Sequence, residues 1–169
     1  MSIMDNLKRT LSGQDGDDPN ADILDTLKQD HDDVAEMLEK LVESESGTER
    51  KSLLTSIKMA LVPHLRAEEK VVYDAVLALR GKEQKEHAEE GYIEHGLGDK
   101  MLASLGKMKD AMSPEFSAGA KVLKELVGHH VEEEENNIWS DVKDNFSSED
   151  RVAMNRKFLA AKTRVRIPA

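Results

Sequence analysis

Histidine and glutamate recur along this chain at a spacing that suits metal binding. Segments 64–69 and 130–135 each read H-x-x-x-E-E, so a histidine and a glutamate stand four residues apart. On a helix such residues share one face and can direct imidazole and carboxylate groups to one point. Two further histidines, His31 and His95, each stand alone in a mostly apolar stripe. Imidazole and carboxylate together suit iron, manganese or zinc.

Four long segments with a helical period carry these residues. We expect these helices at about residues 21–45, 49–80, 82–112 and 114–145. Thr48 and Ser113 are the expected N-caps of the second and fourth helices, and Pro63 should kink the second. A shorter helix over about 148–162 follows. Because the loops are short, the sequence predicts an all-α fold: an antiparallel up-down-up-down four-helix bundle with a short extra C-terminal helix.

The candidate ligands interrupt helix faces that are otherwise apolar. A buried charge is costly unless it is paired or bound to metal. One histidine on an apolar face is more often a core residue satisfied by hydrogen bonds, but one near the middle of each of four helices favours a shared metal site. The six candidate metal ligands are His31, His64, Glu68, His95, His130 and Glu134.

The pattern is repeated within the chain. The second H-x-x-x-E-E segment follows the first with an offset of 66 residues, and each has an aromatic residue four positions on, Tyr73 and Trp139. His31 and His95 correspond with an offset of 64 residues. Two helix hairpins therefore carry equivalent candidate ligands, which predicts a pseudo-symmetric pair of metal ions with the two aromatic residues packed nearby.

A second histidine–glutamate pair on the fourth helix offers an alternative. His129 and Glu133 also stand four residues apart, but their helix face turns polar, whereas the face of His130 stays apolar at both ends. The repeat also aligns His130 with His64. We therefore expect His130 and Glu134 to be ligands, and His129 and Glu133 to face solvent.

The order His31, His64-x-x-x-Glu68, His95, His130-x-x-x-Glu134 resembles the hemerythrin family, in particular its H–HxxxE–H–HxxxE branch, the HHE cation-binding domains. The resemblance covers about residues 21–145. One HxxxE is common on helices, whereas two that alternate with two lone histidines form a fairly specific signature. The resemblance implies a non-haem di-iron centre with two iron ions joined by an oxo or hydroxo bridge; other divalent metals are possible.

By family analogy, each ion would take two of the histidines. His31 and His64 would bind one iron, and His95 and His130 the other. Glu68 and Glu134 would bridge the two. Each ion would then have about five ligands of a preferred six. The remaining position could take a small diatomic or peroxide ligand, such as dioxygen, nitric oxide or peroxide.

The chain departs from the oxygen-carrying hemerythrins at two positions. Gly91 stands where they have a further histidine, and Glu134 where they have an aspartate one residue further along. The missing histidine implies a more symmetric and more open centre and speaks against reversible oxygen carriage; Tyr73 or water could fill the vacancy. The chain has no E-x-x-H, the helix motif of ferritin-like di-iron proteins.

Several neighbouring residues have simpler explanations. Glu69 and Glu135 are expected to be mostly exposed, with hydrogen bonding to ligand histidines as the alternative. His87 is expected to be a solvated partner of nearby glutamates. Gly91 and Gly98 lie one turn to either side of His95, where small residues either open a channel or allow close helix packing.

Composition excludes several other kinds of site. The 169 residues carry a formal net charge of −10, which works against binding to nucleic acid or an anionic membrane. Cysteine is absent, so thiolate metal sites and disulfides are excluded. No apolar run could span a membrane and no secretory signal is visible, so a cytoplasmic location is expected. We expect a flexible tail over 1–20, with a helical turn near 3–11, the bundle over 21–145, and a short helix with a basic tail over 146–169.

Three functions remain open from the sequence. The first is a non-enzymatic module that binds or senses dioxygen or related small oxidants at the di-iron centre. The second is a redox enzyme that removes peroxide or nitric oxide, although no substrate-specific or acid–base residue stands out. The third is an iron-storage, structural or interaction domain, which the intact set of six candidate ligands disfavours. The oligomeric state has no sequence signature.

Overall fold

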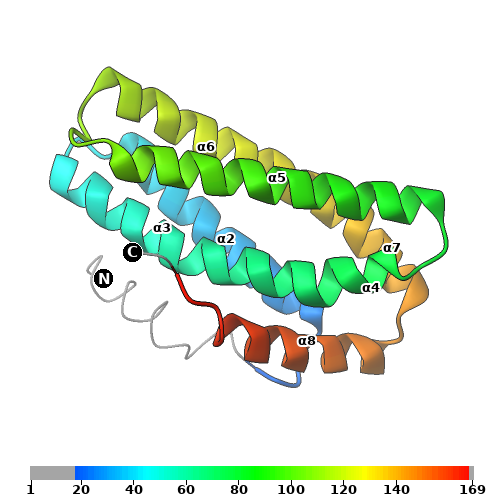
Figure 1. Ribbon diagram of the computed structural model, residues 1–169. Coiled ribbons are helices and arrows are strands. Elements are labelled where there is room, and N and C mark those ends of the chain that lie inside the picture. Colours follow the sequence, from blue (N-terminus) through cyan, green and yellow to red (C-terminus); the bar gives the residue numbers. More distant parts are fainter. Residues whose placement is uncertain (1–17, 168–169) are drawn as a thin grey trace.

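The computed structural model describes residues 18–167, and it is an antiparallel bundle of helices (Figure 1). The long helices are α2 (Ile23–Glu43), α3 (Gly47–Glu68), α5 (Lys82–Lys107) and α6 (Pro114–Glu133). The remaining elements are η1 (Glu69–Tyr73), α4 (Asp74–Leu77), η2 (Glu134–Ile138), α7 (Trp139–Asn145) and α8 (Ser148–Lys162). The predicted all-α bundle with a short extra C-terminal helix is therefore confirmed. The predicted tail and its turn near residues 3–11 lie outside the described residues, apart from residues 18–20.

Side-chain caps fix where four of these helices begin, namely α2, α3, α6 and α8. Ser113 accepts a hydrogen bond from the backbone N–H of Phe116 and starts α6, as predicted. The expected cap at Thr48 was wrong, because Ser46 accepts the bond from the N–H of Glu49 and α3 starts at Gly47. The third helix was predicted to reach about residue 112, but α5 ends at Lys107. α3 runs through Pro63 without ending there.

Both H-x-x-x-E-E segments end in a π-helical turn that periodicity did not predict. η1 begins directly after Glu68, and η2 begins at Glu134. Such single π turns are frequent at functional sites, where they change the direction in which side chains project. α4 and α7 then continue the paths of α3 and α6 (Figure 1). The repeat in the sequence is thus also a repeat in backbone geometry.

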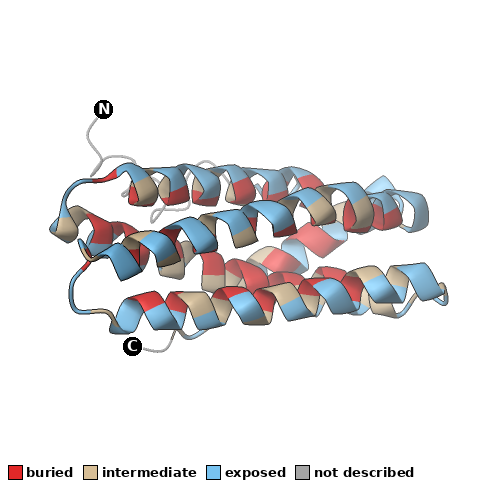
Figure 2. Cartoon of the chain, turned by 90° about the horizontal axis from the view of Figure 1, so that it is seen from above, coloured by how far each residue is buried: buried red, intermediate tan, exposed pale blue. Residues whose placement is uncertain are grey.

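Two apolar clusters fill the bundle from its two ends. The first contains fully buried residues such as Leu41, Ile57 and Leu123, and the second contains Ile23 and Phe158 among others. Figure 2 shows that buried residues line the inner faces of the helices, while exposed residues face outward. The candidate ligands lie along the chain between the members of the two clusters, so both ends of the site are enclosed by hydrophobic packing.

The extra helix α8 packs against α2, α3 and η1. A capping box at Ser147 and Asp150 starts it. Arg151 donates to Asp22 at 2.7 Å, and Phe158 is fully buried. This helix therefore covers one side of the bundle, although the division of the chain at residue 145 remains a prediction.

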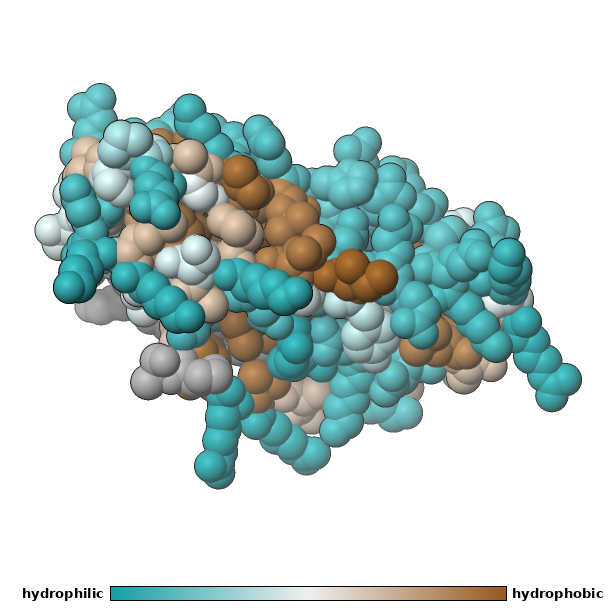
Figure 3. Space-filling model, turned by 45° about the horizontal axis from the view of Figure 1, so that its top comes forward, coloured by the Kyte–Doolittle hydropathy of each residue, from teal (hydrophilic) through white to brown (hydrophobic). Residues whose placement is uncertain are grey.

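Most of the surface in Figure 3 is hydrophilic, with an apolar patch among the charged side chains. The large apolar side chains exposed on α5 and α6 are Ile93, Leu97 and Val122. Within residues 18–167, no helix is long and apolar enough to cross a membrane.

Candidate metal centre

The bundle brings all six predicted ligand side chains together at its middle. His31 comes from α2, His95 from α5, and each H-x-x-x-E pair from α3 or from α6 and η2. Each of the six residues is at most 6% exposed. Burial of so many ionisable groups is costly unless a partner compensates it. The residues buried at this point are His31, His64, Glu68, His95, His130 and Glu134.

Each glutamate lies between one histidine of the His31/His64 pair and one histidine of the His95/His130 pair. A carboxylate oxygen of Glu68, Oε2, lies 3.5 Å from Nε2 of His64 and 3.4 Å from Nε2 of His95. Oε2 of Glu134 lies 3.5 Å from Nε2 of both His31 and His130. This is the arrangement expected if each carboxylate bridges two metal ions.

Ligand atoms gather in two groups that share Glu68. His31 and His64 form one group with Glu68, and His95 and His130 form the other. Within each group the donor atoms lie within 4.8 Å of one another. The Nε2 atoms of His95 and His130 are 3.1 Å apart. Two nitrogens about 2.0–2.1 Å from one ion, at roughly 90°, would be about 3 Å apart, so this spacing fits a shared metal.

Unsatisfied atoms in the site test whether a metal fits. Both carboxylate oxygens of Glu68, both of Glu134 and Nε2 of His31 are buried without a hydrogen-bond partner. Buried polar atoms are nearly always paired, since an unpaired one costs about 1–3 kcal/mol and more when charged. Buried carboxylate oxygens without hydrogen bonds, converging with imidazole nitrogens, fit a divalent metal. The role of the six residues as metal ligands remains a prediction.

A carboxylate holds the far nitrogen, Nδ1, of each candidate histidine. On one side, Nδ1 of His31 lies 3.0 Å from Glu135 and Nδ1 of His64 lies 2.9 Å from Asp30. On the other, Nδ1 of His95 lies 2.9 Å from Glu69. The fourth contact, from His130 to Glu94, is 2.7 Å. Such contacts direct Nε2 toward a metal and increase its basicity.

These carboxylates were the main features that sequence reasoning missed. Glu69 and Glu135 were expected to be mostly exposed, but their side chains are 16% and 26% exposed and they bind the histidines. Asp30 and Glu94 were not predicted at all. Each stands directly before a lone histidine but contacts a histidine of a different helix, so no pattern along one helix indicated its role. Lys162 of α8 also donates to Asp30, at 2.7 Å.

The protonation of the metal-free site reflects burial and the two central carboxylates. Burial lowers the pKa of His31 to about 4. Burial also opposes charge on His64, but the carboxylates of Glu68 and Asp30 outweigh it and raise the pKa to about 10. The pKa of His130 is likewise about 10, because the nearby carboxylates of Glu134 and Glu94 outweigh burial. Burial, together with repulsion from Glu68, raises the pKa of Glu134 to about 8.

The aromatic residues that contact the histidines differ between the two halves of the site. Trp139 stacks on His31 with ring centroids 6.0 Å apart, and Phe158 meets His64 edge-on at 5.7 Å. Tyr73 stacks on His95 at 5.1 Å and places its hydroxyl 3.2 Å from Nε2 of that histidine. Tyr73 therefore does more than pack, because a hydroxyl reaches the candidate metal centre only in the His95/His130 half.

Tyr73 also explains one of the two glycines near His95. A Cβ atom on Gly91 would lie 2.7 Å from the Tyr73 ring and hydroxyl, so the glycine makes room for the tyrosine. A Cβ atom on Gly98 would meet nothing within 4 Å, so close packing does not explain that glycine.

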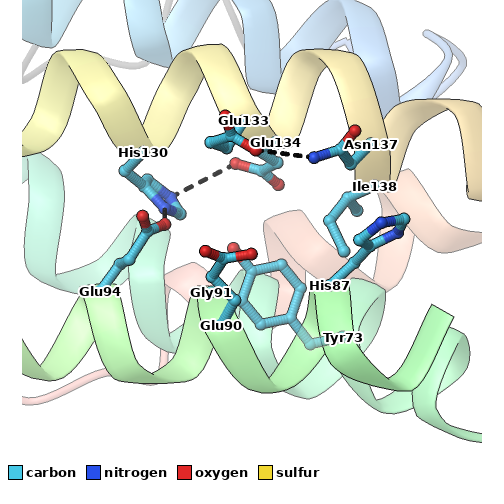
Figure 4. Close-up of a pocket in the computed structure, with 10 residues that line it drawn as sticks. All are labelled: Tyr73, His87, Glu90, Gly91, Glu94, His130, Glu133, Glu134, Asn137 and Ile138. Atoms are coloured by element: carbon cyan, nitrogen blue, oxygen red, sulfur yellow. Dashed lines mark hydrogen bonds and ion pairs between the residues drawn. The ribbon is translucent and has the colours of Figure 1, made fainter. Parts of the chain in front are cut away.

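A small cavity of about 10 Å³ opens beside the His95/His130 half (Figure 4). It lies between α5 on one side and α6 with η2 on the other, and Tyr73, Gly91, His130 and Glu134 line its inner part. Its volume is that of about one water-sized sphere. Two candidate ligands, His130 and Glu134, line this cavity.

The remaining histidines lie outside the group of six. His129 is exposed, as predicted. Glu133 is only partly exposed: it accepts a bond from Asn137 at 2.8 Å and lines the cavity, so the expectation that it simply faces solvent was wrong. The Nδ1 atom of His87 lies 2.8 Å from the buried Asp141 of α7 rather than beside the glutamates of its own helix.

Comparison with known proteins identifies the family. The family model described as the hemerythrin HHE cation binding domain matches residues 22–139. The chain therefore belongs to the hemerythrin HHE cation-binding domain family, which implies a metal-binding site, and the buried histidine and glutamate groups are the candidates for it.

The chain is also similar to a longer protein of described activity. It is 27% identical over 152 residues to a protein of Nostoc sp. described as a DNA nickase. The similarity covers 90% of this chain but 42% of that protein, so the chain spans less than half the length of its relative. No solved structure matches the chain significantly.

Proposed function

We propose that this chain is a di-iron protein that binds or senses dioxygen or a related small oxidant, such as peroxide or nitric oxide. In this proposal His31 and His64 hold one iron and His95 and His130 hold the other. Glu68 and Glu134 bridge the two. When bound, the irons would supply electrons and an open coordination position to the oxidant.

The observation that carries the proposal is the set of unsatisfied donors at the centre of the bundle. Both oxygens of Glu68 and of Glu134 are buried without a hydrogen-bond partner, although every histidine around them has a carboxylate on its other nitrogen. The protein thus satisfies the outer atoms of the site and leaves the central carboxylate oxygens without hydrogen bonds. This is the pattern expected where the inner atoms bind metal.

The size of the cavity supports a small ligand. A space of about 10 Å³ beside His130 and Glu134 holds about one water-sized molecule, which suits a small ligand better than an organic substrate. The Tyr73 hydroxyl, 3.2 Å from Nε2 of His95, lies beside the same space and could donate a hydrogen bond to a ligand there. Burial raises the pKa of Tyr73 well above its usual range, so this hydroxyl keeps its proton.

Exposure of the reduced, iron-loaded protein to oxidants tests the proposal. Dioxygen, peroxide and nitric oxide are added separately and the absorption spectrum is followed. We expect at least one to change the spectrum in proportion to the iron present, with no change in a Glu68→Gln variant treated in the same way. No response of the iron-loaded protein to any of the three would contradict the proposal. Repeated turnover of peroxide or nitric oxide would instead establish the alternative, a redox enzyme.

DNA nicking is a second candidate function because the similar Nostoc protein is described as a DNA nickase. The net charge of −10 opposes binding to a phosphate backbone, so we keep the prediction that this chain does not bind nucleic acid. Metal-loaded protein is incubated with supercoiled plasmid. We expect no nicking beyond that of the free metal. Nicking that disappears in the Glu68→Gln variant would establish the second candidate.

A further inference from the structure

The cavity beside the His95/His130 half has an acidic mouth. Glu90 on α5 is exposed, whereas Glu133 on α6 is partly buried, and both line the cavity (Figure 4). Further in, Glu94 is 11% exposed and Glu134 is buried. Four glutamates therefore line the cavity, from the exposed Glu90 to the buried Glu134.

At the mouth, no lining residue cancels this negative charge. No lysine or arginine lines the cavity, and the imidazole of His130 at its inner end is paired with Glu94, 2.7 Å from its Nδ1. Asn137 is neutral, and it orients Glu133 by donating to it at 2.8 Å. His87 faces its own acidic partner, Asp141, at 2.8 Å. A narrow passage lined by charge of one sign concentrates ions of the opposite sign and repels ions of the same sign.

The inner end of the passage has free ligand atoms. Both carboxylate oxygens of Glu134 are buried without a hydrogen-bond partner, and this side chain lines the cavity (Figure 4). A cation that entered at Glu90 could exchange its waters for carboxylate oxygens step by step. Divalent cations lose hydration water reluctantly, so such replacement oxygens lower the barrier to entering a buried site.

Aromatic side chains and a lysine cover the opposite half of the site. Trp139 stacks on His31, and Phe158 of α8 meets His64 edge-on. Lys162 of α8 binds Asp30 on the outer side of His64, which places a positive charge there. A cation approaching from that side would meet aromatic rings and a lysine.

We propose that the acidic cavity is the route by which divalent cations, ferrous iron in particular, reach the centre, with Glu90 and Glu133 capturing the ion at its mouth. This inference rests on the proposed metal centre. It assigns to the two glutamates a role in the rate of metal uptake and not in the final number of ions bound.

The test compares metal uptake by two double variants with the same change in charge. The route variant carries Glu90→Gln and Glu133→Gln. The control carries Glu89→Gln and Glu132→Gln, two exposed glutamates directly next to them on the same helices that do not line the cavity. Metal-free protein is mixed rapidly with Co²⁺, whose absorption reports binding, and with Fe²⁺ under anaerobic conditions.

We expect the route variant to take up metal at least ~10-fold more slowly, with an unchanged final number of ions per chain. The control should load at nearly the wild-type rate. Equal rates for the wild type and both variants would overturn the proposed route. A lower final number of ions in the route variant would also overturn it, because the glutamates would then be ligands or structural residues. If the wild type binds no metal, the proposed function itself fails.

Discussion

The two halves of the candidate metal centre have equivalent histidines but different surroundings. The His31/His64 half is covered by Trp139 and by Phe158 of α8, without a hydroxyl from the aromatic residue. The His95/His130 half has Tyr73 with its hydroxyl 3.2 Å from His95, and a cavity leads to it. A repeated motif can therefore build two equivalent ligand sets, while the aromatic residue of each repeat and the packing around it differ between the halves.

The largest expected effect comes from the residue that the two halves share. Glu68 belongs to both groups of candidate ligands. The Glu68→Gln change keeps the shape of the side chain but removes the carboxylate that would bridge the two ions. We therefore expect the iron affinity of both halves to fall by more than ~100-fold, which exceeds the effect of losing a carboxylate that contacts a histidine Nδ1. Iron analysis after anaerobic loading measures this, with Glu132→Gln as an exposed control. Full iron content in the Glu68 variant would show that the halves do not share this residue.

Metal binding should depend steeply on pH because protons and metal compete for the same atoms. His64 and His130, with pKa values raised to about 10, and Glu134, raised to about 8, hold protons at pH 7 when metal is absent. Loading should then release about three protons per chain, and the overall affinity should rise about a thousandfold per pH unit near neutrality. The slope should decrease above about pH 8 and again near pH 10.

A pH indicator in weak buffer measures the protons released on loading. His31, whose pKa is lowered to about 4, should contribute none. Release of one proton or fewer at pH 7 would show that the site is already deprotonated and that the two halves are not held by protonated partners in the metal-free protein.

Replacing a carboxylate that contacts Nδ1 of a ligand histidine should have a smaller effect on metal affinity. One such variant in each half allows the two halves to be compared. Asp30→Asn acts on His64 in the closed half, and Glu94→Gln acts on His130 in the open half. Each should weaken metal binding by about 10–100-fold, because each removes a charged acceptor from a ligand histidine. Competition with a coloured chelator measures both affinities. Unchanged affinity in both variants would mean that these contacts are incidental.

The smallest expected effect is a difference in stability between variants of the two glycines near His95. Gly91→Ala would place Cβ 2.7 Å from the buried Tyr73 ring, so we expect a loss of about 1–3 kcal/mol in the free energy of unfolding. Gly98→Ala meets nothing within 4 Å and should stabilise α5 by up to about 1 kcal/mol through its helix propensity. Thermal unfolding of both metal-free variants measures the difference. Equal stabilities would show that Tyr73 does not occupy the space above Gly91 in solution.

The sequence predicted the parts of the molecule that follow from periodicity. The fold and the convergence of His31, His64, Glu68, His95, His130 and Glu134 were predictable, because polar residues on apolar helix faces must meet inside a bundle. The choice of His130 over His129 depended on the same reasoning: the first is buried and the second exposed.

Other features depend on how neighbouring helices are rotated and could not be predicted from one helix at a time. Asp30 and Glu94 look like ordinary surface acids until α3 and α6 bring His64 and His130 beside them. The π turns after the two H-x-x-x-E segments have no periodic signal, yet η1 includes the buried Tyr73 that stacks on His95. The side of the bundle covered by α8 depends likewise on tertiary packing.

The number of iron ions bound per chain tests the central claim most directly. Metal-free protein is titrated with ferrous iron under anaerobic conditions, unbound metal is removed, and iron and protein are measured on the same sample. Two adjacent ligand groups that share Glu68 predict two irons per chain. No bound iron, saturation at one iron, or a preference for a single zinc would contradict a two-metal centre with a closed and an open half.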